Sequence, residues 1–271
     1  MESKSKAAAL YCLATGDIGA DRLRLLDAIY GPAFYSLLLR LKLNETARMV
    51  DVGCGTGNTA LWLGNTFTRA EITGVDVSTE QLTLARASAE MQGLHNVRFL
   101  VADACATTLA TGVYDLVHCR ALLCHLKDPM RALAEMRRLV KPGGILLCED
   151  FDSNSVITEP PRGAYARAQE LDTKLFRAMG LDADIGLRLP SLLARVCVAS
   201  PQIQFFQPAF LSGEGKRLIE YTLAEQLPYI VETGVATREQ MISLMDALRQ
   251  VNEDDQVLVA LWRMTQAWGY G

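Results

Sequence analysis

Three aspartates and a glycine cluster are the residues whose types and spacing could do chemistry in this sequence. The cluster has the pattern Gly-x-Gly-x-Gly, formed by Gly53, Gly55 and Gly57. Glycines at a strand-to-helix turn let a ligand approach the backbone closely, because no Cβ stands in the way. Asp51 precedes the first glycine by two residues. A carboxylate at that point suits a cationic or zwitterionic ligand, because opposite charges attract strongly in a poorly solvated cleft.

Two further aspartates end predicted strands downstream of the cluster. Asp76 lies 23 residues after Gly53, where a carboxylate can accept hydrogen bonds from the vicinal hydroxyls of a ribose. Asp103 closes the next predicted strand, and its carboxylate can accept a hydrogen bond from an exocyclic amine such as that of adenine. The carboxyl ends of parallel strands form the ligand edge of an open α/β sheet. We therefore expect Asp51, Asp76 and Asp103 to meet at one edge.

The elements that position these residues follow from an alternation of apolar runs and amphipathic stretches between residues 45 and 150. Five apolar runs predict strands, at 49–52, 71–77, 97–101, 114–119 and 145–148. The runs are almost continuous, as expected for strands covered on both faces by helices. Ser78 with Gln81, and Asp128 before Pro129, are start signals for the intervening helices. This alternation predicts an α/β fold with a doubly wound parallel sheet.

The flanking segments predict more helices and the remaining strands. Residues 21–30 and 33–43 predict two helices, separated by a break at Gly31-Pro32. Beyond residue 150, strands are predicted at 203–206 and 257–261, with 265–270 as an extension, and helices from 160, at 215–231 and at 237–252. We divide the chain into an N-terminal helical cover (1–44), a cofactor-binding core (45–150), and a completion of the sheet with a helical substrate lid (151–271).

Composition and charge exclude several classes of protein. Half of the 271 residues are hydrophobic, which allows one large folded domain, or one domain with a cap. A net charge of −4 without a strongly basic stretch argues against a nucleic-acid binder. No apolar run approaches the roughly 18 residues of a membrane span, and the first residues lack the apolar core of a signal peptide. We therefore expect a cytoplasmic protein.

The seven cysteines suit reduced thiols, because their number is odd and their spacing matches no disulfide framework. His118-Cys119 and Cys124-His125 place four soft ligands close together in sequence, which makes a zinc site conceivable. Neighbouring side chains at the end of a strand point to opposite faces, so they share one metal ion poorly. We therefore expect no metal site.

Residues 45–150 resemble a class I S-adenosylmethionine-dependent methyltransferase, and within that family the small-molecule branch that includes the ubiquinone and menaquinone methyltransferases. The motifs occur in the expected order and spacing, and together they are specific. They comprise residues 50–57, 74–78, 101–104, 114–117, 123–129 and 139–144. One departure is Cys124, where the family often has a second histidine beside His125. This difference weakens the argument that the pair acts as a catalytic unit.

The resemblance implies a Rossmann-like sheet of seven mostly parallel strands and S-adenosylmethionine as the cofactor. Asp51 is then expected to reach the ammonium of the methionine portion, Asp76 the ribose, and Asp103 the edge of the adenine. The other implied cofactor-binding residues are Gly53, Cys54 and Gly55 in the glycine loop, Val77 packed on the adenine, Gln81 at the ribose or adenine, Ala104 at the adenine edge, and the backbone carbonyl of Arg120 near the methionine end.

The function that follows is methyl transfer to a small, largely apolar or aromatic metabolite, as in natural-product biosynthesis. The cofactor supplies the activated methyl group, so the protein mainly positions, dehydrates and sometimes deprotonates the acceptor. His125 is the leading general-base candidate, because its unperturbed pKa lies near neutrality, although it could instead fix the loop before Asp128. Glu149 and Asp150 are alternatives. Further candidates are Tyr11 and Tyr30 as a cofactor cover, and Phe151, Phe176, Phe206, Phe210, Tyr221 and Tyr229 as pocket aromatics.

Two other functions compete with this interpretation. An NAD(P)-dependent oxidoreductase would share the fold, but Asn58 replaces the third glycine of the dinucleotide fingerprint. A non-catalytic binder of S-adenosylmethionine is the second alternative. The methylated atom is open among carbon, oxygen, nitrogen and sulfur. A homo-oligomer formed through the N-terminal helices or the lid is compatible with the sequence.

Overall fold

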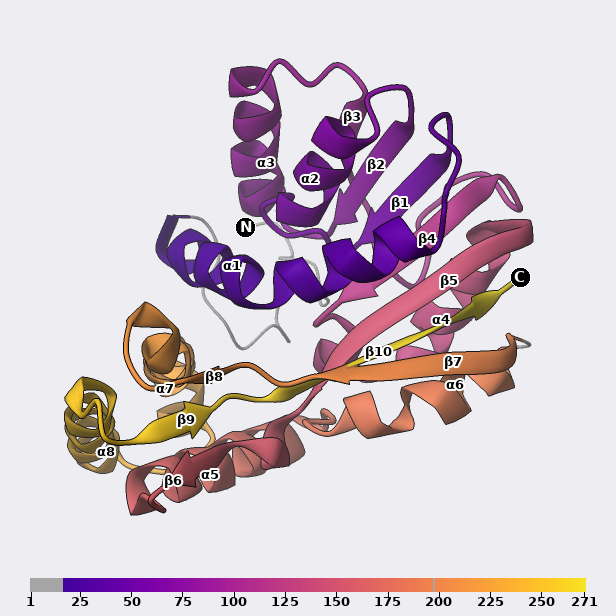
Figure 1. Cartoon of the computed structure of the whole chain (residues 1–271). Helices are drawn as coiled ribbons and strands as arrows, with labels where there is room; N and C mark the ends of the chain where they lie inside the picture. Colours follow the sequence, from indigo (N-terminus) through magenta and orange to yellow (C-terminus); the bar gives the residue numbers. More distant parts are fainter. Residues whose placement is uncertain (1–16, 197) are drawn as a thin grey trace, which may run out of the picture.

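A seven-stranded sheet forms the centre of the computed structural model, which describes residues 17–196 and 198–271 (Figure 1). Its strands are β1 (Arg48–Val52), β2 (Glu71–Asp76), β3 (Val97–Val101), β4 (Tyr114–Arg120), β5 (Val140–Asp152), β7 (Ala199–Phe206) and β10 (Arg263–Tyr270). The spatial order is β3-β2-β1-β4-β5-β10-β7. β10 runs antiparallel to both of its neighbours, and the other pairs are parallel. The predicted fold class is thus confirmed.

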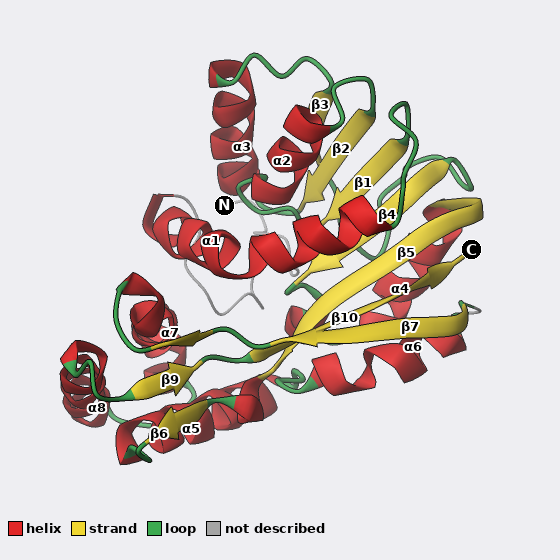
Figure 2. Cartoon of the chain, in the orientation of Figure 1, coloured by secondary structure: helices red, strands yellow, loops and turns green. Residues whose placement is uncertain are grey.

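Helices cover both faces of this sheet, as Figure 2 shows. The helices of the described residues are α1 (Asp17–Arg40), α2 (Asn58–Thr66), α3 (Thr79–Met91), α4 (Pro129–Leu139), α5 (Gly163–Met179), α6 (Leu189–Arg195), α7 (Leu218–Glu232) and α8 (Arg238–Glu253). Of these, α5, α7 and α8 pack mainly against one another rather than on the large sheet. One core lies under α2, α3 and the second half of α1, and a second core includes α4, α5, α6, α7 and α8. Strands buried from both sides explain the nearly continuous apolar runs in the sequence.

The predicted helix starts are where the sequence places them. The Ser78 hydroxyl accepts a hydrogen bond from the Gln81 N–H at the start of α3. The Asp128 carboxylate accepts one from the Arg131 N–H at the start of α4. These caps matter for the site, because they fix the loops that follow β2 and β4. None of the helices in the described ranges is both long and apolar enough to cross a membrane.

The break predicted at Gly31-Pro32 is wrong, because α1 runs uninterrupted through Pro32. An internal proline removes one backbone hydrogen bond and strains the preceding turn. Here tertiary packing outweighs that cost: Tyr30, Phe34 and Leu38 are buried along one continuous face of the helix. The same helix therefore reaches from the β1 side of the sheet to α7 (Figure 1).

The segment after residue 256 also differs from expectation. β9 (Leu258–Ala260) does not continue into β10, because it belongs to a separate three-stranded sheet with β6 (Ile157–Glu159) and β8 (Ala209–Phe210). Between the two strands, the Leu261 N–H donates to the Pro208 carbonyl, and the Trp262 carbonyl accepts from the Tyr30 hydroxyl. These bonds redirect the chain from the small sheet into the large one. β5 is longer than the predicted 145–148 at both ends, because it begins at Val140, which pairs with Tyr114 on β4, and residues 149–152 pair with β10.

Candidate active site

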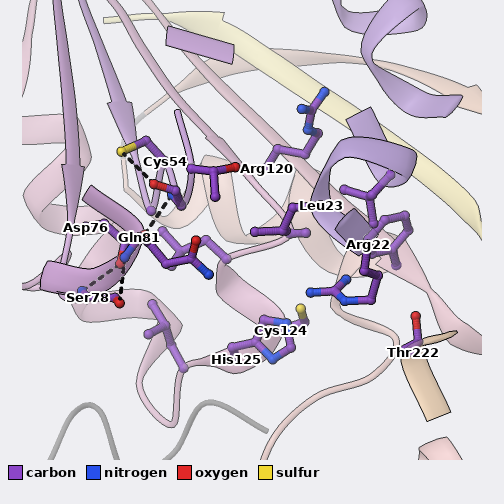
Figure 3. Close-up of a pocket in the computed structure, with 18 of the residues that line it drawn as sticks. Arg22, Leu23, Cys54, Asp76, Ser78, Gln81, Arg120, Cys124, His125 and Thr222 are labelled. Carbon is purple, nitrogen blue, oxygen red and sulfur yellow. Dashed lines mark hydrogen bonds between the residues drawn. The ribbon is translucent and has the colours of Figure 1, made fainter. Parts of the chain in front are cut away.

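A cavity of about 740 Å³ opens at the carboxyl ends of the parallel strands (Figure 3). The loops after β1, β2 and β4 form one wall, and α1, α5 and α7 form the opposite wall. Such a volume is typical of sites that bind a small molecule. The cavity therefore lies at the predicted ligand edge of the sheet.

The glycine loop is held tightly against the end of β2. Gly53 and Gly55 have φ values of +72° and +53°, a region that favours glycine. The N–H groups of Gly53 and Cys54 both donate to the Val75 carbonyl, at 2.8 and 3.0 Å. A Cβ on Gly53 would come within 2.8 Å of Leu122 Cδ1. The loop thus exposes bare backbone to the cavity in a fixed conformation.

Asp76 lies between this loop and the start of α3. Its Oδ2 accepts from the Gly55 N–H at 2.9 Å, and its Oδ1 accepts from the Ser78 N–H at 2.8 Å. Burial raises the pKa of Asp76, although these hydrogen bonds lower it in part. Each carboxylate oxygen can accept more than one hydrogen bond, so the same group can also receive hydroxyl donors from the cavity.

Gln81 lies beside Asp76 on the first turn of α3, as Figure 3 shows. Its side chain is only 3% exposed and lines the cavity. Its Oε1 has no hydrogen-bond partner within the described parts of the chain. A buried carbonyl oxygen without a partner is energetically costly, so this atom is available for a donor on a bound molecule.

Asp51 reaches the cavity from β1, but it is also part of a buried chain of hydrogen bonds. His118 on β4 is 0% exposed, and its Nδ1 lies 2.8 Å from Asp51 Oδ1. The Nε2 atom of the same ring lies 2.9 Å from Glu149 Oε2 on β5. Glu149 also accepts from the side chain of Gln266 on β10. We call Asp51, His118 and Glu149 the buried triad.

Arg120 ends β4 at the rim of the cavity. Its guanidinium pairs with Asp27 on α1 at 2.5 Å and donates to the Thr59 hydroxyl at 3.1 Å. Burial lowers the pKa of Arg120, but the charges of Glu149 and Asp27 raise it more, so the net pKa is raised. The sequence predicted a role only for the backbone carbonyl of Arg120. In the structure, its side chain also connects β4 to α1 through the ion pair with Asp27.

His125 lines the cavity on the loop after β4. Burial, and secondarily the charge of Arg22, lower its pKa to about 3. Its ring centre lies 5.6 Å from that of Phe176. The imidazole is therefore neutral near pH 7 and accepts a proton poorly, which favours a positioning role over that of a general base.

The alternative bases lie farther from the cavity surface. Glu149 and Asp150 are buried and do not line the cavity. Asp150 accepts a hydrogen bond from the Cys124 N–H at 3.2 Å, and burial raises its pKa to about 6. This carboxylate supports the backbone of the loop that carries His125.

The structure brings most of the predicted site residues to the cavity wall. Those lining it are Asp51, Gly53, Cys54, Gly55, Asp76, Val77, Gln81, Arg120 and His125. Asp103 and Ala104 do not line it, and Asp103 is exposed. Asp103 Oδ1 accepts from the Cys105 N–H at 2.8 Å, so this carboxylate shapes its own loop. The roles of both residues toward adenine stay predictions.

Half of the six aromatic residues predicted for the substrate pocket line the cavity. Phe151, Phe176 and Tyr229 line the cavity, whereas Phe206, Phe210 and Tyr221 do not. Tyr30 does not line it either, because it is buried in the core with its hydroxyl on the Trp262 carbonyl. Tyr11 lies outside the described residues.

Sequence reasoning missed polar residues on the opposite wall, namely Arg22, Asp172, Thr222 and Gln226. No motif marks them, because they come from three helices far apart in the chain. Arg22 forms an ion pair with Glu225 at 2.8 Å, which joins α1 to α7. His118 was considered in the sequence only as a possible zinc ligand, and its contacts with Asp51 and Glu149 were missed.

Comparisons of sequence agree with this arrangement. Residues 50–148 match the family described as "Methyltransferase domain". The chain is 37% identical over 118 residues to a demethylmenaquinone methyltransferase from Thermus thermophilus, a match that covers 44% of this chain and 50% of the relative. It is 35% identical over 136 residues to a trans-aconitate 2-methyltransferase from Azoarcus sp., covering 48% and 51%. The matched segment thus spans about half the length of both relatives.

Comparisons of structure extend the likeness of the fold beyond that segment. The YcgJ protein from Bacillus subtilis is similar over 87% of this chain and 97% of its own, with a TM-score of 0.59 and 20% identity. A phosphoethanolamine N-methyltransferase 2 from Haemonchus contortus, solved in complex with S-adenosyl-L-methionine, is similar over 93% of this chain and 53% of its own. Its TM-score is 0.54 and its identity 17%. These likenesses concern the fold.

Proposed function

Because residues 50–148 make this chain a member of the class I S-adenosylmethionine-dependent methyltransferases, we propose that it transfers a methyl group from S-adenosylmethionine to a small, largely apolar or aromatic metabolite. The observation that supports the proposal is that one cavity contains both a polar wall suited to the cofactor and aromatic surface suited to an acceptor. The glycine loop, Asp76 and Gln81 form the polar wall. Phe151, Phe176 and Trp262 contribute aromatic surface to the same cavity.

The polar wall fits the cofactor. The unpartnered Oε1 of Gln81 offers an acceptor to a ribose hydroxyl or to the adenine amine, and Asp76 offers a carboxylate to the ribose. Asp51 would hold the ammonium of the methionine portion beside the exposed backbone of Gly53 and Gly55. When bound, S-adenosylmethionine supplies a methyl group attached to a positively charged sulfur.

The residues of this chain contribute mainly binding, orientation and exclusion of water. Helices α1, α5 and α7 close the side of the cavity opposite the strands, which removes water from the acceptor. His125, neutral near pH 7, can orient an acceptor group by a hydrogen bond without taking its proton. Catalysis would therefore depend on positioning and desolvation.

The test combines two measurements. Titration calorimetry of the whole chain with S-adenosylmethionine and, separately, with NAD determines which cofactor binds. Incubation with methyl-labelled S-adenosylmethionine and a panel of small aromatic, quinone-like and carboxylic acid metabolites then detects transfer. Label in at least one acceptor is the expected result. Binding of S-adenosylmethionine without transfer to any member would support a non-catalytic binder, and binding of NAD alone would refute the proposal.

A further inference from the structure

The helical wall of the cavity contains a pair of buried hydrogen-bond acceptors that the proposed cofactor site does not use. Asp172 on α5 is 6% exposed, and Gln226 on α7 is 1% exposed. Gln226 Nε2 donates to Asp172 Oδ1 at 2.9 Å. Both side chains line the cavity. The pair is thus buried against the protein but faces the space where a substrate would lie.

The amide of Gln226 is only half satisfied. Its nitrogen is engaged by Asp172, which directs its oxygen elsewhere, and Oε1 has no hydrogen-bond partner in the described residues. Leaving a buried acceptor unpaired costs about 1–3 kcal/mol, so such atoms are rare unless a ligand or water completes them. Gln226 Oε1 therefore marks a place where a donor is expected.

The carboxylate of Asp172 can also accept further hydrogen bonds. Burial raises its pKa, and the hydrogen bonds from Gln226 and Ser153 lower it only in part. No ion pair found among residues 17–196 and 198–271 includes Asp172. A buried carboxylate without a cation is stabilised by any further N–H or O–H donor that reaches it.

The surroundings of the pair are mostly apolar. Phe176 lies one helical turn after Asp172, and Tyr229 lies one turn after Gln226; both line the same cavity. Thr222, one turn before Gln226, uses its hydroxyl to donate to the Leu218 carbonyl. The two acceptors therefore lie beside aromatic surface, on a wall that also carries Arg22, and such precisely placed polar groups fix the orientation of a ligand.

We propose that Asp172 and Gln226 form a substrate subsite that accepts hydrogen bonds from a hydroxyl or amino group on an otherwise apolar or aromatic acceptor molecule. This inference rests on the proposed function and narrows its substrate class. A molecule without a donor would leave both acceptors unpaired on binding and would be rejected for that reason.

The experiment uses three naphthalene probes that differ only in the group facing the subsite: 2-naphthalenemethanol, 2-naphthylmethylamine and 2-methylnaphthalene. Each is titrated by fluorescence into the whole chain with and without saturating S-adenosylhomocysteine. We expect the wild type to bind one or both of the donor-bearing probes at least fivefold more tightly than 2-methylnaphthalene. Equal affinity for all three, or no binding of any, overturns the inference.

Two variants test whether Asp172 and Gln226 cause the preference for donor-bearing probes. Gln226→Leu should abolish the preference, whereas Gln250→Leu, an exposed position on α8, should preserve it. Asp172→Asn keeps the shape of the side chain but removes its charge. It should therefore lower the affinity for the amine probe about tenfold and change the affinity for the alcohol probe less than twofold. A preference unchanged in both Gln226→Leu and Asp172→Asn overturns the inference.

Failure of the subsite and failure of the proposed function can be told apart. Binding of S-adenosylhomocysteine to the opposite wall is measured independently by calorimetry. A chain that binds S-adenosylhomocysteine but does not discriminate among the probes contradicts the subsite alone. A chain that discriminates among the probes but does not bind S-adenosylhomocysteine contradicts the proposed function alone.

Discussion

His118 Nδ1 lies 2.8 Å from Asp51 Oδ1, and these two residues are also register partners on the adjacent parallel strands β4 and β1. The opposite ring nitrogen lies 2.9 Å from Glu149 Oε2. Ionised carboxylates only accept hydrogen bonds, so both ring nitrogens must donate when Asp51 and Glu149 are ionised. The buried triad is then an imidazolium held between two carboxylates, and it fixes the orientation of Asp51 at the cavity.

Replacing His118 should destabilise the fold strongly. His118→Leu keeps an apolar side chain of similar size but leaves two buried carboxylates without their partner, which typically costs about 3–5 kcal/mol. Urea unfolding at pH 7, followed by circular dichroism, measures the free energy of unfolding. His95→Leu at an exposed position is the control and should change it by less than about 0.5 kcal/mol. Equal stability of the two variants would contradict the role of the triad.

The stabilisation by His118 should depend on pH. Burial lowers the pKa of His118, but the hydrogen bonds and charges of Asp51 and Glu149 raise it more, so its net pKa lies above the ordinary value of 6.5. Its other neighbours are the ring of Phe34, 4.4 Å away between centres, and the charge of Arg120, which acts on Glu149.

A raised pKa in the folded state means that the stabilisation is fully present below pH 6.5 and is lost as the pH rises through the folded-state pKa. The difference in unfolding free energy between the wild type and His118→Leu should therefore shrink between pH 6.5 and 9. Urea titrations at several pH values in this range measure it. A difference that grows with pH would show that His118 is neutral in the fold.

Asp76→Asn should weaken the binding of S-adenosylmethionine by roughly 1.5–3 kcal/mol, because charge-assisted hydrogen bonds to the ribose are lost. The amide oxygen can still accept a hydrogen bond from one of the two backbone N–H groups that Asp76 binds, that of Gly55 in the glycine loop or that of Ser78 before α3, so asparagine disturbs the site less than alanine would. Calorimetry measures the affinity. Glu90→Gln, exposed on the same helix α3, serves as the control. Unchanged affinity in folded Asp76→Asn would place the ribose elsewhere.

Gln81→Leu should weaken the binding of S-adenosylmethionine without destabilising the ligand-free protein. Removal of the unpartnered Oε1 removes a desolvation penalty, so the ligand-free protein should be as stable as the wild type or more so. The affinity for S-adenosylmethionine should nevertheless fall about tenfold, equivalent to about 1.4 kcal/mol, because the cofactor loses an acceptor. Thermal unfolding and calorimetry on the same sample provide the two values. A parallel loss of both would indicate a structural role only.

His125 should stay neutral throughout the pH range of most assays. Its pKa is lowered to about 3, so the chemical shift of its ring protons should not titrate between pH 5 and 8. Nuclear magnetic resonance of the wild type, with His125→Asn to assign the signal, measures this directly. A midpoint near 6.5 would show that the ring is hydrated in solution and would restore it as a general-base candidate.

Local patterns predicted most of the cofactor half of the fold. β3 coincides with the predicted 97–101, and α3 and α4 begin at the predicted start signals. The glycine loop and Asp76 were found because strand, turn and helix are contiguous in the chain, so their spacing records their geometry. Pro32 was misinterpreted because local propensity was given more weight than the apolar face that continues on both sides of it.

The substrate half could not be derived in the same way. Asp172 and Gln226 are 54 positions apart on two helices, and the sequence contains no signal that their side chains meet. His118 and Glu149 likewise meet only because β4 and β5 pair in one particular register. Tertiary packing, rather than any short motif, decides which polar groups face the cavity.

The position of β10 between β5 and β7 has a consequence for the newly made chain. Among residues 17–196 and 198–271, β7 pairs in the large sheet with β10 alone, yet more than fifty residues separate the two strands. Until residues 263–270 leave the ribosome, the edges of β5 and β7 stay open, and the exposed backbone could pair with other nascent chains. Synthesis slowed before that point should therefore increase aggregation and dependence on chaperones.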